Sequence, residues 1–291
     1  MLKRRSSLLA AAALMLLCGC VDQSGSEKKK DQSIAVTSVA SAEILDALEV
    51  PASQVVGIPS SDSYTIPKRY QGITSLGTAM TPDMEILSSL NPGIVISPNS
   101  LESELASKYE SIHVDSVFLN LKSVSGMYKS IEELGAYLGR EKQAEKLVDE
   151  FVSFMQEYSS AHTESPKVLI LMGLPGSYVA ATESSYVGDL VRLAGGSNVY
   201  GDGDGKDFLN ANAEDMLKKK PDIILRTSHA MPEQVKTMFA KEFKDNDIWN
   251  KFDAVKNNKV YDLSNESFGM SANMKYKKAL KELEKLLYAE D

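Results

Sequence analysis

The sequence has few residues that form cross-links or build metal sites from several side chains. Its 291 residues include two cysteines, three histidines and one tryptophan. Both cysteines, Cys18 and Cys20, lie at the N-terminus. The rest of the chain therefore has no disulfide, no thiolate metal site and no cysteine nucleophile.

The sequence also lacks a basic excess. It has 32 lysine and arginine residues against 40 aspartate and glutamate residues, a formal net charge of −8. An acidic chain argues against nucleic-acid binding, which requires clustered lysine and arginine. A hydrophobic content of 43% with 25% charged residues is typical of a globular protein. The length is sufficient for two modest domains.

Only the N-terminus carries a long apolar run. A basic start is followed by small and apolar residues over 6–17, which is the pattern of a secretory signal and is too short to span a bilayer. The run ends in Leu17-Cys-Gly-Cys20, which resembles a bacterial lipobox. That resemblance implies cleavage after Gly19 and a diacylglyceryl anchor on Cys20, with two acyl chains for stable attachment. An uncleaved export signal is the alternative. We expect a signal peptide over 1–19 and a lipidated flexible tether over 20–32.

From residue 33 onwards, short apolar runs alternate with helical patterns. Predicted strands lie at 34–39, 55–58, 94–97 and 114–119, with helices between them. This alternation indicates a parallel α/β sheet, which we assign to an N-terminal lobe over 33–121.

A long helical pattern follows the first lobe. Apolar residues recur at helical spacing, and Gly139-Arg140 offers one point of interruption. The pattern is far longer than a usual globular helix. We therefore predict a rigid connecting helix over 122–163.

Strand and helix patterns alternate again over 164–291, which we assign to a C-terminal lobe. Strands are predicted at 168–172, 222–226 and 260–263, and Ser185 is a predicted cap for a helix that starts at Tyr186. The expected fold is thus α/β and bilobal, with two parallel-sheet lobes joined by a long rigid helix.

Candidate binding residues follow the predicted strands. Ligands of parallel α/β sheets bind at the loops that leave the carboxyl ends of strands. Tyr64 and Met80 lie in the connection after 55–58, Ser177 and Tyr178 follow 168–172, and His229 follows 222–226. We expect all five at the binding edges of their sheets.

His229 is the only histidine in such a position. His113 precedes a strand, and His162 lies in a polar segment. One histidine argues against a dedicated zinc or manganese site, which needs three or four ligands. An ordinary surface residue is the alternative interpretation of His229.

Met80 is one of 12 methionines, most of which are expected in the core. Packing under the next helix is the alternative role for its side chain. Two features favour a rigidly presented side chain instead. Gly77 permits a tight turn, and Pro82 suits the first position of a helix capped by Thr81.

Other motifs are weak. Asp202, Asp204 and Asp207 lack the bidentate glutamate of a calcium loop, so we predict a surface loop. No phosphate loop, nucleophile elbow or zinc-protease motif is present, and no nucleophile and base pair stands out. These absences favour a binding protein over an enzyme. Glu85 and Glu214 fall in the first turns of predicted helices, where they complement the helix dipole or place a charge on the rim of each lobe.

Six segments together resemble a known family. They lie at 77–82 and 91–97 in the first lobe, and at 167–178, 186–196, 221–232 and 242–263 in the second. The chain resembles the periplasmic-binding-protein-like lipoproteins that serve ABC importers of siderophores, cobalamin and haem, and among them the haem receptors of Gram-positive iron-regulated surface systems. The likeness covers the chain from about residue 33 to the end.

The resemblance implies one haem in the cleft, with Met80 and His229 as axial ligands from opposite lobes. Thioether and imidazole ligands fill both axial positions, which suits carriage and not oxygen chemistry. Tyr64, Ser177 and Tyr178 are candidates for the haem pocket, where hydroxyl donors suit the propionates.

The resemblance also implies partners. Glu85 and Glu214 match the rim glutamates that dock on arginines of an ABC permease. The expected protein is a monomer that receives haem from cell-wall haem-binding proteins at the outer face of the cell membrane. A ferric siderophore is the alternative cargo, for which Tyr64, Tyr178 and Arg226 are the candidate contacts.

Overall fold

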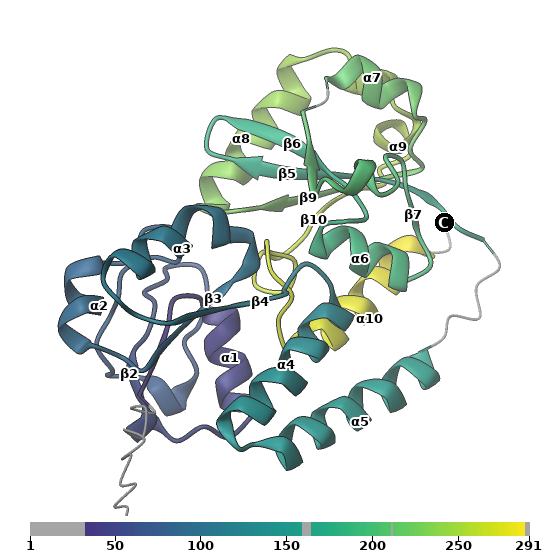
Figure 1. Cartoon of the computed structure of the whole chain (residues 1–291). Helices are drawn as coiled ribbons and strands as arrows, with labels where there is room; N and C mark the ends of the chain where they lie inside the picture. The colour runs from purple at the N-terminus through teal and green to yellow at the C-terminus, as the bar shows by residue number, and fades with distance from the viewer. Residues whose placement is uncertain (1–32, 159–163, 211, 289–291) are drawn as a thin grey trace, which may run out of the picture. The chain divides into compact units, whose positions relative to one another are not determined.

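The computed structural model describes residues 33–158, 164–210 and 212–288. The predicted signal peptide, the lipidation of Cys20, the tether and His162 lie outside the described residues. Two β-sheets organise the rest, each with helices on both faces (Figure 1). No helix in the described ranges combines the length and the apolar character needed to cross a bilayer.

The first lobe holds a four-stranded parallel sheet in the order β2-β1-β3-β4. Alternate residues of β1 face opposite layers: Ile34 and Val36 pack towards α1, whereas Ala35 packs with Val95 against α2 and α3. Its strands and helices are β1 (Ile34–Val36), α1 (Val39–Ala47), β2 (Val55–Gly57), α2 (Met84–Leu90), β3 (Ile94–Pro98), α3 (Glu102–Ser111) and β4 (Ser116–Leu119).

The second lobe holds a six-stranded sheet in the order β10-β9-β5-β6-β8, with β7 also paired to β5. The even-numbered residues of β5 face α6 and α10, and its odd-numbered leucines face the cluster around Trp249. Its elements are β5 (Lys167–Leu174), β6 (Ser177–Ala181), α6 (Tyr186–Leu193), β7 (Ser197–Asn198), β8 (Phe208–Leu209), α7 (Ala213–Lys218), β9 (Ile223–Ser228), α8 (Pro232–Asp245), α9 (Asp253–Lys256), β10 (Val260–Asp262) and α10 (Tyr276–Leu287).

These sheets confirm the predicted α/β, bilobal fold class, with one difference in the second lobe. Its sheet is mixed, because β6 runs antiparallel to β5 and to β8. Gly176 has a φ of 83°, which lets the chain turn back directly between β5 and β6. The prediction of Ser185 as a helix cap was correct, since its side chain accepts a hydrogen bond from the Gly188 N–H.

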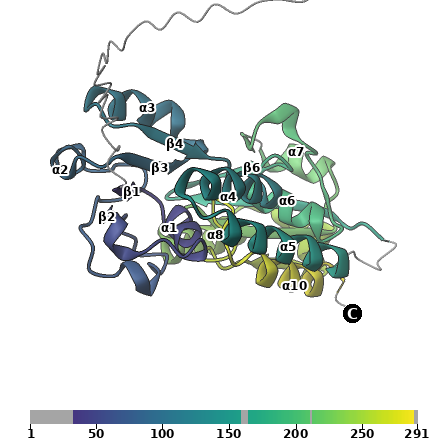
Figure 2. The same ribbon diagram turned by 60° about the horizontal axis from the view of Figure 1, so that its bottom comes forward.

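The connector is two helices, not the single long helix that was predicted. The helix α4 (Val124–Leu138) ends at Gly139, which has a φ of 67°, and α5 (Glu141–Tyr158) begins after Arg140. The two helices pack closely where a β-carbon on Gly135 would lie 2.6 Å from that of Ala144. Figure 2 shows α4, α5, α6 and α10 gathered into one helical layer. The connector therefore turns back on itself and packs against the second lobe.

A segment over 264–275 joins β10 to α10 and touches both lobes. The Ala272 N–H donates to the Leu121 carbonyl at 2.8 Å, and the Thr227 hydroxyl donates to the Phe268 carbonyl at 2.6 Å. The Lys275 ammonium lies 2.9 Å from a carboxylate oxygen of Glu43 in the first lobe. We call this stretch the crossing segment. It lies between the two sheets in Figure 1.

Candidate functional site

Met80 and His229 meet between the two lobes. The Nε2 atom of His229 lies 3.3 Å from the Sδ atom of Met80, although 149 positions separate the residues in sequence. Their juxtaposition agrees with the expectation that the two residues face each other.

Met80 stands at the tip of a tight turn. The Thr81 N–H donates to the Thr78 carbonyl at 3.2 Å, and the two threonine hydroxyls lie 2.8 Å apart. Gly77 enters this turn with a φ of 83°. The Met80 side chain is 56% exposed, so it is not core filler. The turn, held by its own hydrogen bonds, thus presents the Met80 thioether to His229 of the second lobe.

The predicted start of the following helix was wrong. Helix α2 begins at Met84 and is capped by Asp83, whose carboxylate accepts from the N–H groups of Glu85 and Ile86. Pro82 therefore lies in the turn before the helix and not at its first position, and Thr81 closes the turn instead of capping α2. A β-turn, rather than the helix start, positions Met80.

His229 is fixed through its backbone at the end of β9. Its N–H donates to the Gly173 carbonyl at 3.0 Å, at the neighbouring end of β5. The Nδ1 atom is buried and has no hydrogen-bond partner among the described residues. Burial lowers the pKa of the His229 imidazole below its usual value of 6.5. The ring is therefore neutral at pH 7, and a neutral imidazole is the form that binds metals.

The burial of His229 leads to a testable prediction about the pKa of its imidazole in the haem-free protein. We expect the His229 imidazole to titrate below pH 6.5, because the folded state disfavours the charged ring. Between the two pKa values the unfolded chain binds more protons, so stability rises with pH there and is lost as pH falls through the folded pKa. NMR of the imidazole resonances, assigned by their absence in His229→Ala, measures the shift. A midpoint at or above 6.5 would contradict the prediction.

The donor set fits an iron bound between two axial ligands, but the present contact is too short to contain one. Bonds to imidazole nitrogen and to sulfur are about 2.0 and about 2.3 Å in protein metal sites, so the two atoms would lie roughly 4.3 Å apart. The observed separation is 3.3 Å. The two atoms therefore have to move apart by about 1 Å to admit a metal between them. No group of three or more histidine, cysteine or acidic side chains within the described ranges is arranged to hold a metal ion.

Tyr64 borders the crossing segment. Its hydroxyl lies so close to Gly269 that a β-carbon there would be 2.3 Å from the oxygen. Burial, with a smaller contribution from the Glu43 carboxylate, raises the pKa of Tyr64 to about 12. The hydroxyl therefore stays protonated and can donate a hydrogen bond.

Ser177 and Tyr178 lie at the same sheet edge as His229, because Gly173 pairs with both Tyr178 and Ser228. The Tyr178 hydroxyl donates to Glu242 at 3.2 Å, and its ring packs near Phe239 and Trp249. Its donor is therefore already engaged. Ser177 is exposed at the hairpin.

Arg226 is also engaged. Its guanidinium donates twice to the Asp262 carboxylate, at 2.8 and 2.7 Å, and lies 4.8 Å from the centre of the Phe243 ring. A cation that is paired and stacked in this way is poorly placed to neutralise an anionic cargo.

Glu85 and Glu214 occupy the positions predicted for them. Each is exposed in the first turn of its helix, Glu85 in α2 of the first lobe and Glu214 in α7 of the second. Figure 1 shows these helices on different lobes.

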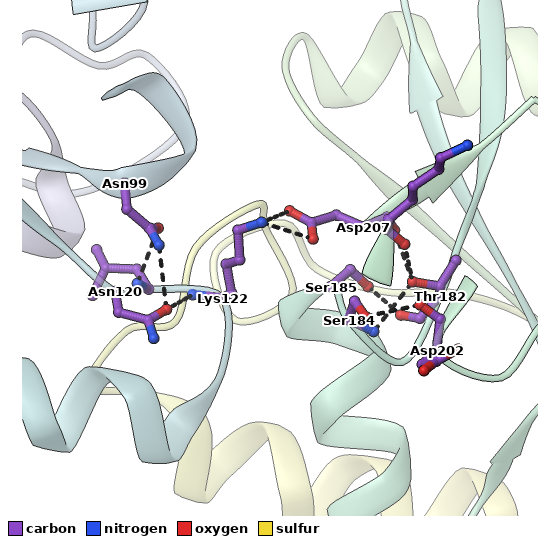
Figure 3. A network of polar contacts seen from close by, with 10 residues as sticks. Asn99, Asn120, Lys122, Thr182, Ser184, Ser185, Asp202 and Asp207 are labelled. Carbon is purple, nitrogen blue, oxygen red and sulfur yellow. Dashed lines mark hydrogen bonds and ion pairs between the residues drawn. The ribbon is translucent and has the colours of Figure 1, made fainter. Parts of the chain in front are cut away.

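A polar contact that the sequence did not reveal links the lobes. The Lys122 ammonium, just after the first sheet, lies 3.0 Å from the Asp207 carboxylate of the second lobe, as Figure 3 shows. The N–H of Val124, at the start of α4, donates to the buried Asp189 carboxylate at 2.9 Å. Asp207, considered above for a calcium loop, thus pairs with lysine. These contacts connect α4 to the second lobe.

Comparison with known proteins places these features in context. Residues 34–266 match the periplasmic binding protein family. The chain is 41% identical over 281 residues to the high-affinity heme uptake system protein IsdE of Staphylococcus aureus, covering 95% of this chain and 94% of the relative.

Two solved structures are similar throughout. A substrate-binding protein of an ABC transporter from Listeria monocytogenes is 46% identical, with a TM-score of 0.81 over 89% of this chain and 99% of its own. S. aureus IsdE complexed with heme is 43% identical, with a TM-score of 0.83 over 88% of this chain and 98% of its own.

Proposed function

We propose, from the premise that the chain belongs to the periplasmic binding protein family, that it binds haem and delivers it to an ABC-type permease. One observation carries the proposal: an imidazole and a thioether from opposite lobes meet at 3.3 Å in a chain closely similar to a heme uptake protein. Haem iron accepts this pair as axial ligands. We assign Met80 to one face of the haem and His229 to the other.

The remaining polar groups suit the edge of a haem. Tyr64 is a protonated hydroxyl at the crossing segment, and Ser177 is exposed beside the edge that carries His229. We propose both as donors to the propionates. Tyr178 is better explained as a support for α8 through Glu242.

A ferric siderophore is the weaker candidate cargo. The three residues considered for it are Tyr64, Tyr178 and Arg226. Arg226 is paired with Asp262 and Tyr178 is bonded to Glu242, so two of the three are committed elsewhere. Because the relatives are transport proteins, we propose a carrier and not an enzyme.

Titration with haemin tests the function directly. We expect the purified protein to bind haemin with a stoichiometry of about one and to show the sharp visible bands of low-spin iron with imidazole and thioether ligands. Absorbance spectroscopy, on protein purified from a haem-containing host and on haemin-titrated protein, measures both. Tight binding of a ferric siderophore without haemin binding would overturn the proposal.

Docking to the permease involves Glu85 and Glu214 in our proposal. We expect Glu85→Arg and Glu214→Arg each to weaken permease binding about tenfold or more, since like charges facing each other are strongly unfavourable. Haem-dependent ATP hydrolysis by the permease in proteoliposomes measures the effect. The matched control is Glu102→Arg, because Glu102 is also an exposed glutamate in the first turn of a helix, α3. Equal activity in all three variants would refute the assignment.

We further propose that the chain acts at the outer face of the cell membrane, anchored through a lipid on Cys20 and supplied by cell-wall haem-binding proteins. The lipobox-like Leu17 to Cys20 supports the anchor. Replacement of Cys20 by Ala should release the protein into the medium, as measured by fractionation of cells. Retention of the variant in the membrane would contradict the anchor.

A further inference from the structure

A second thioether, that of Met231, follows His229 by two positions in the sequence. Met231 is 50% exposed, and in the described part of the chain only Met80, Tyr137 and Val152 are the other exposed large hydrophobic side chains. Residues two positions apart have α-carbons no more than about 7 Å apart. Met231 therefore shares the edge of the second lobe with His229, and its flexible side chain can reach the same region.

Local stability does not explain a methionine at this position. Met231 precedes α8 with a φ of 51° and a ψ of 56°, and its side chain makes no capping hydrogen bond. This left-handed conformation costs a non-glycine residue roughly 1–2 kcal/mol. Serine, threonine, aspartate and asparagine are the residues that cap helices, and glycine is the residue that tolerates this φ. Six other non-glycine residues of the described chain also have a positive φ, so what distinguishes Met231 is its exposed thioether two positions from His229.

No hydrogen bond within the described residues holds the Nδ1 side of the His229 ring. Metal-bound histidines usually donate their second ring N–H to an acceptor, which fixes the ring and strengthens the bond. The Nδ1 atom of His229 is buried without such a partner among the described residues. Its bond to a metal would lack that support, which favours exchange of the ligand.

Geometry limits what Met231 can replace. His229 and Met231 both follow β9 of the second lobe, so both would approach a haem held between the lobes from the same side, whereas Met80 would approach it from the first lobe. A ligand from the second lobe cannot take the Met80 position while the porphyrin lies between. Met231 can exchange only with His229.

We propose, resting on the function proposed above, that Met231 is an alternate axial ligand of haem iron that binds in place of His229. In the exchange the bond from iron to Nε2 breaks and a bond from iron to the Met231 sulfur forms. No electron is transferred, and the imidazole leaves neutral. Because thioethers are soft ligands, the exchange is favoured for ferrous iron. Iron then stays six-coordinate while the histidine is free.

Ferrous spectra of four proteins test the proposal: the native chain, His229→Ala, and His229→Ala combined with Met231→Leu or with Met231→Gly. Each is loaded with haemin, reduced with dithionite and examined by absorbance and magnetic circular dichroism. We expect ferrous His229→Ala to remain low-spin with two sulfur ligands. Both double variants should become high-spin and release haem at least about tenfold faster.

The glycine variant separates ligation from folding. Glycine accepts a φ of 51° without strain, so Met231→Gly removes the sulfur while relieving the backbone. Thermal unfolding of each haem-free variant provides the check. A high-spin His229→Ala protein, or double variants that keep its low-spin spectrum, would overturn the role of Met231. Failure of the native chain to bind haemin would instead refute the proposed function.

Discussion

Haemin should bind to the Met80→Ala/His229→Ala double variant at least about 100-fold more weakly than to the native chain. The double substitution removes the two side chains that meet between the lobes. Loss of a group that only supports a metal ligand lowers metal affinity by about 10–100-fold, so the loss of both proposed axial ligands should exceed that range. Titration followed by absorbance, with transfer to a haem-free globin as a competition, measures the affinity.

The effect of each single substitution on haem affinity should depend on the oxidation state of the iron. Methionine favours ferrous iron, whereas histidine serves both states, so His229→Ala should weaken ferric haem binding more than Met80→Ala does. The controls are His113→Asn, at an exposed histidine whose φ of 58° asparagine tolerates, and Met84→Leu in α2. Both controls should bind haemin as the native chain does. A double variant with native affinity and a low-spin spectrum would rule out both ligand assignments.

The fold was predictable because its signals are local. Alternation of apolar strands with helices, and a serine before the helix at Tyr186, identify the two sheets and their order along the chain. The connector was predicted less well. A glycine that ends a helix and one that continues it look alike in sequence, and the difference is the φ of 67° at Gly139. Tertiary packing at Gly135 favours an end of the helix at Gly139, because the missing side chain allows α4 and α5 to approach closely.

The sequence predicted which strand each candidate residue follows, but not which side chains touch. Strand order places Met80 and His229 at binding edges, but no pattern in the sequence reports the distance between them. The register of neighbouring strands pairs Arg226 with Asp262, and the face of β6 directs Tyr178 to Glu242. Both facts depend on which strands are adjacent. The positive φ of Met231 has no sequence signal either.

The Gly188→Ala substitution should destabilise the protein by about 3 kcal/mol or more, which is a large part of a typical stability of 5–15 kcal/mol. Gly188 lies in the first turn of α6, where a β-carbon would be 1.8 Å from the Thr182 carbonyl oxygen. Because the obstacle is backbone, the turn before α6 has to move.

That turn is closed from both sides. The Ser185 hydroxyl donates to the Thr182 carbonyl at 2.7 Å and accepts from the Gly188 N–H at 3.1 Å. The next residue, Asp189, accepts from the Val124 N–H at the start of the connector. Displacement of the turn therefore loses a helix cap, worth about 1 kcal/mol, and disturbs the junction between the lobes. Haem affinity should fall together with stability.

Urea unfolding followed by circular dichroism measures the loss. Gly176→Ala is the matched control, because Gly176 has a φ of 83° with open space around it and should cost only about 1–2 kcal/mol through backbone strain. Gly176 lies in the β5–β6 hairpin, whereas the start of the connector bonds to Asp189 of α6. A Gly188→Ala protein as stable as Gly176→Ala would mean that the turn before α6 yields easily.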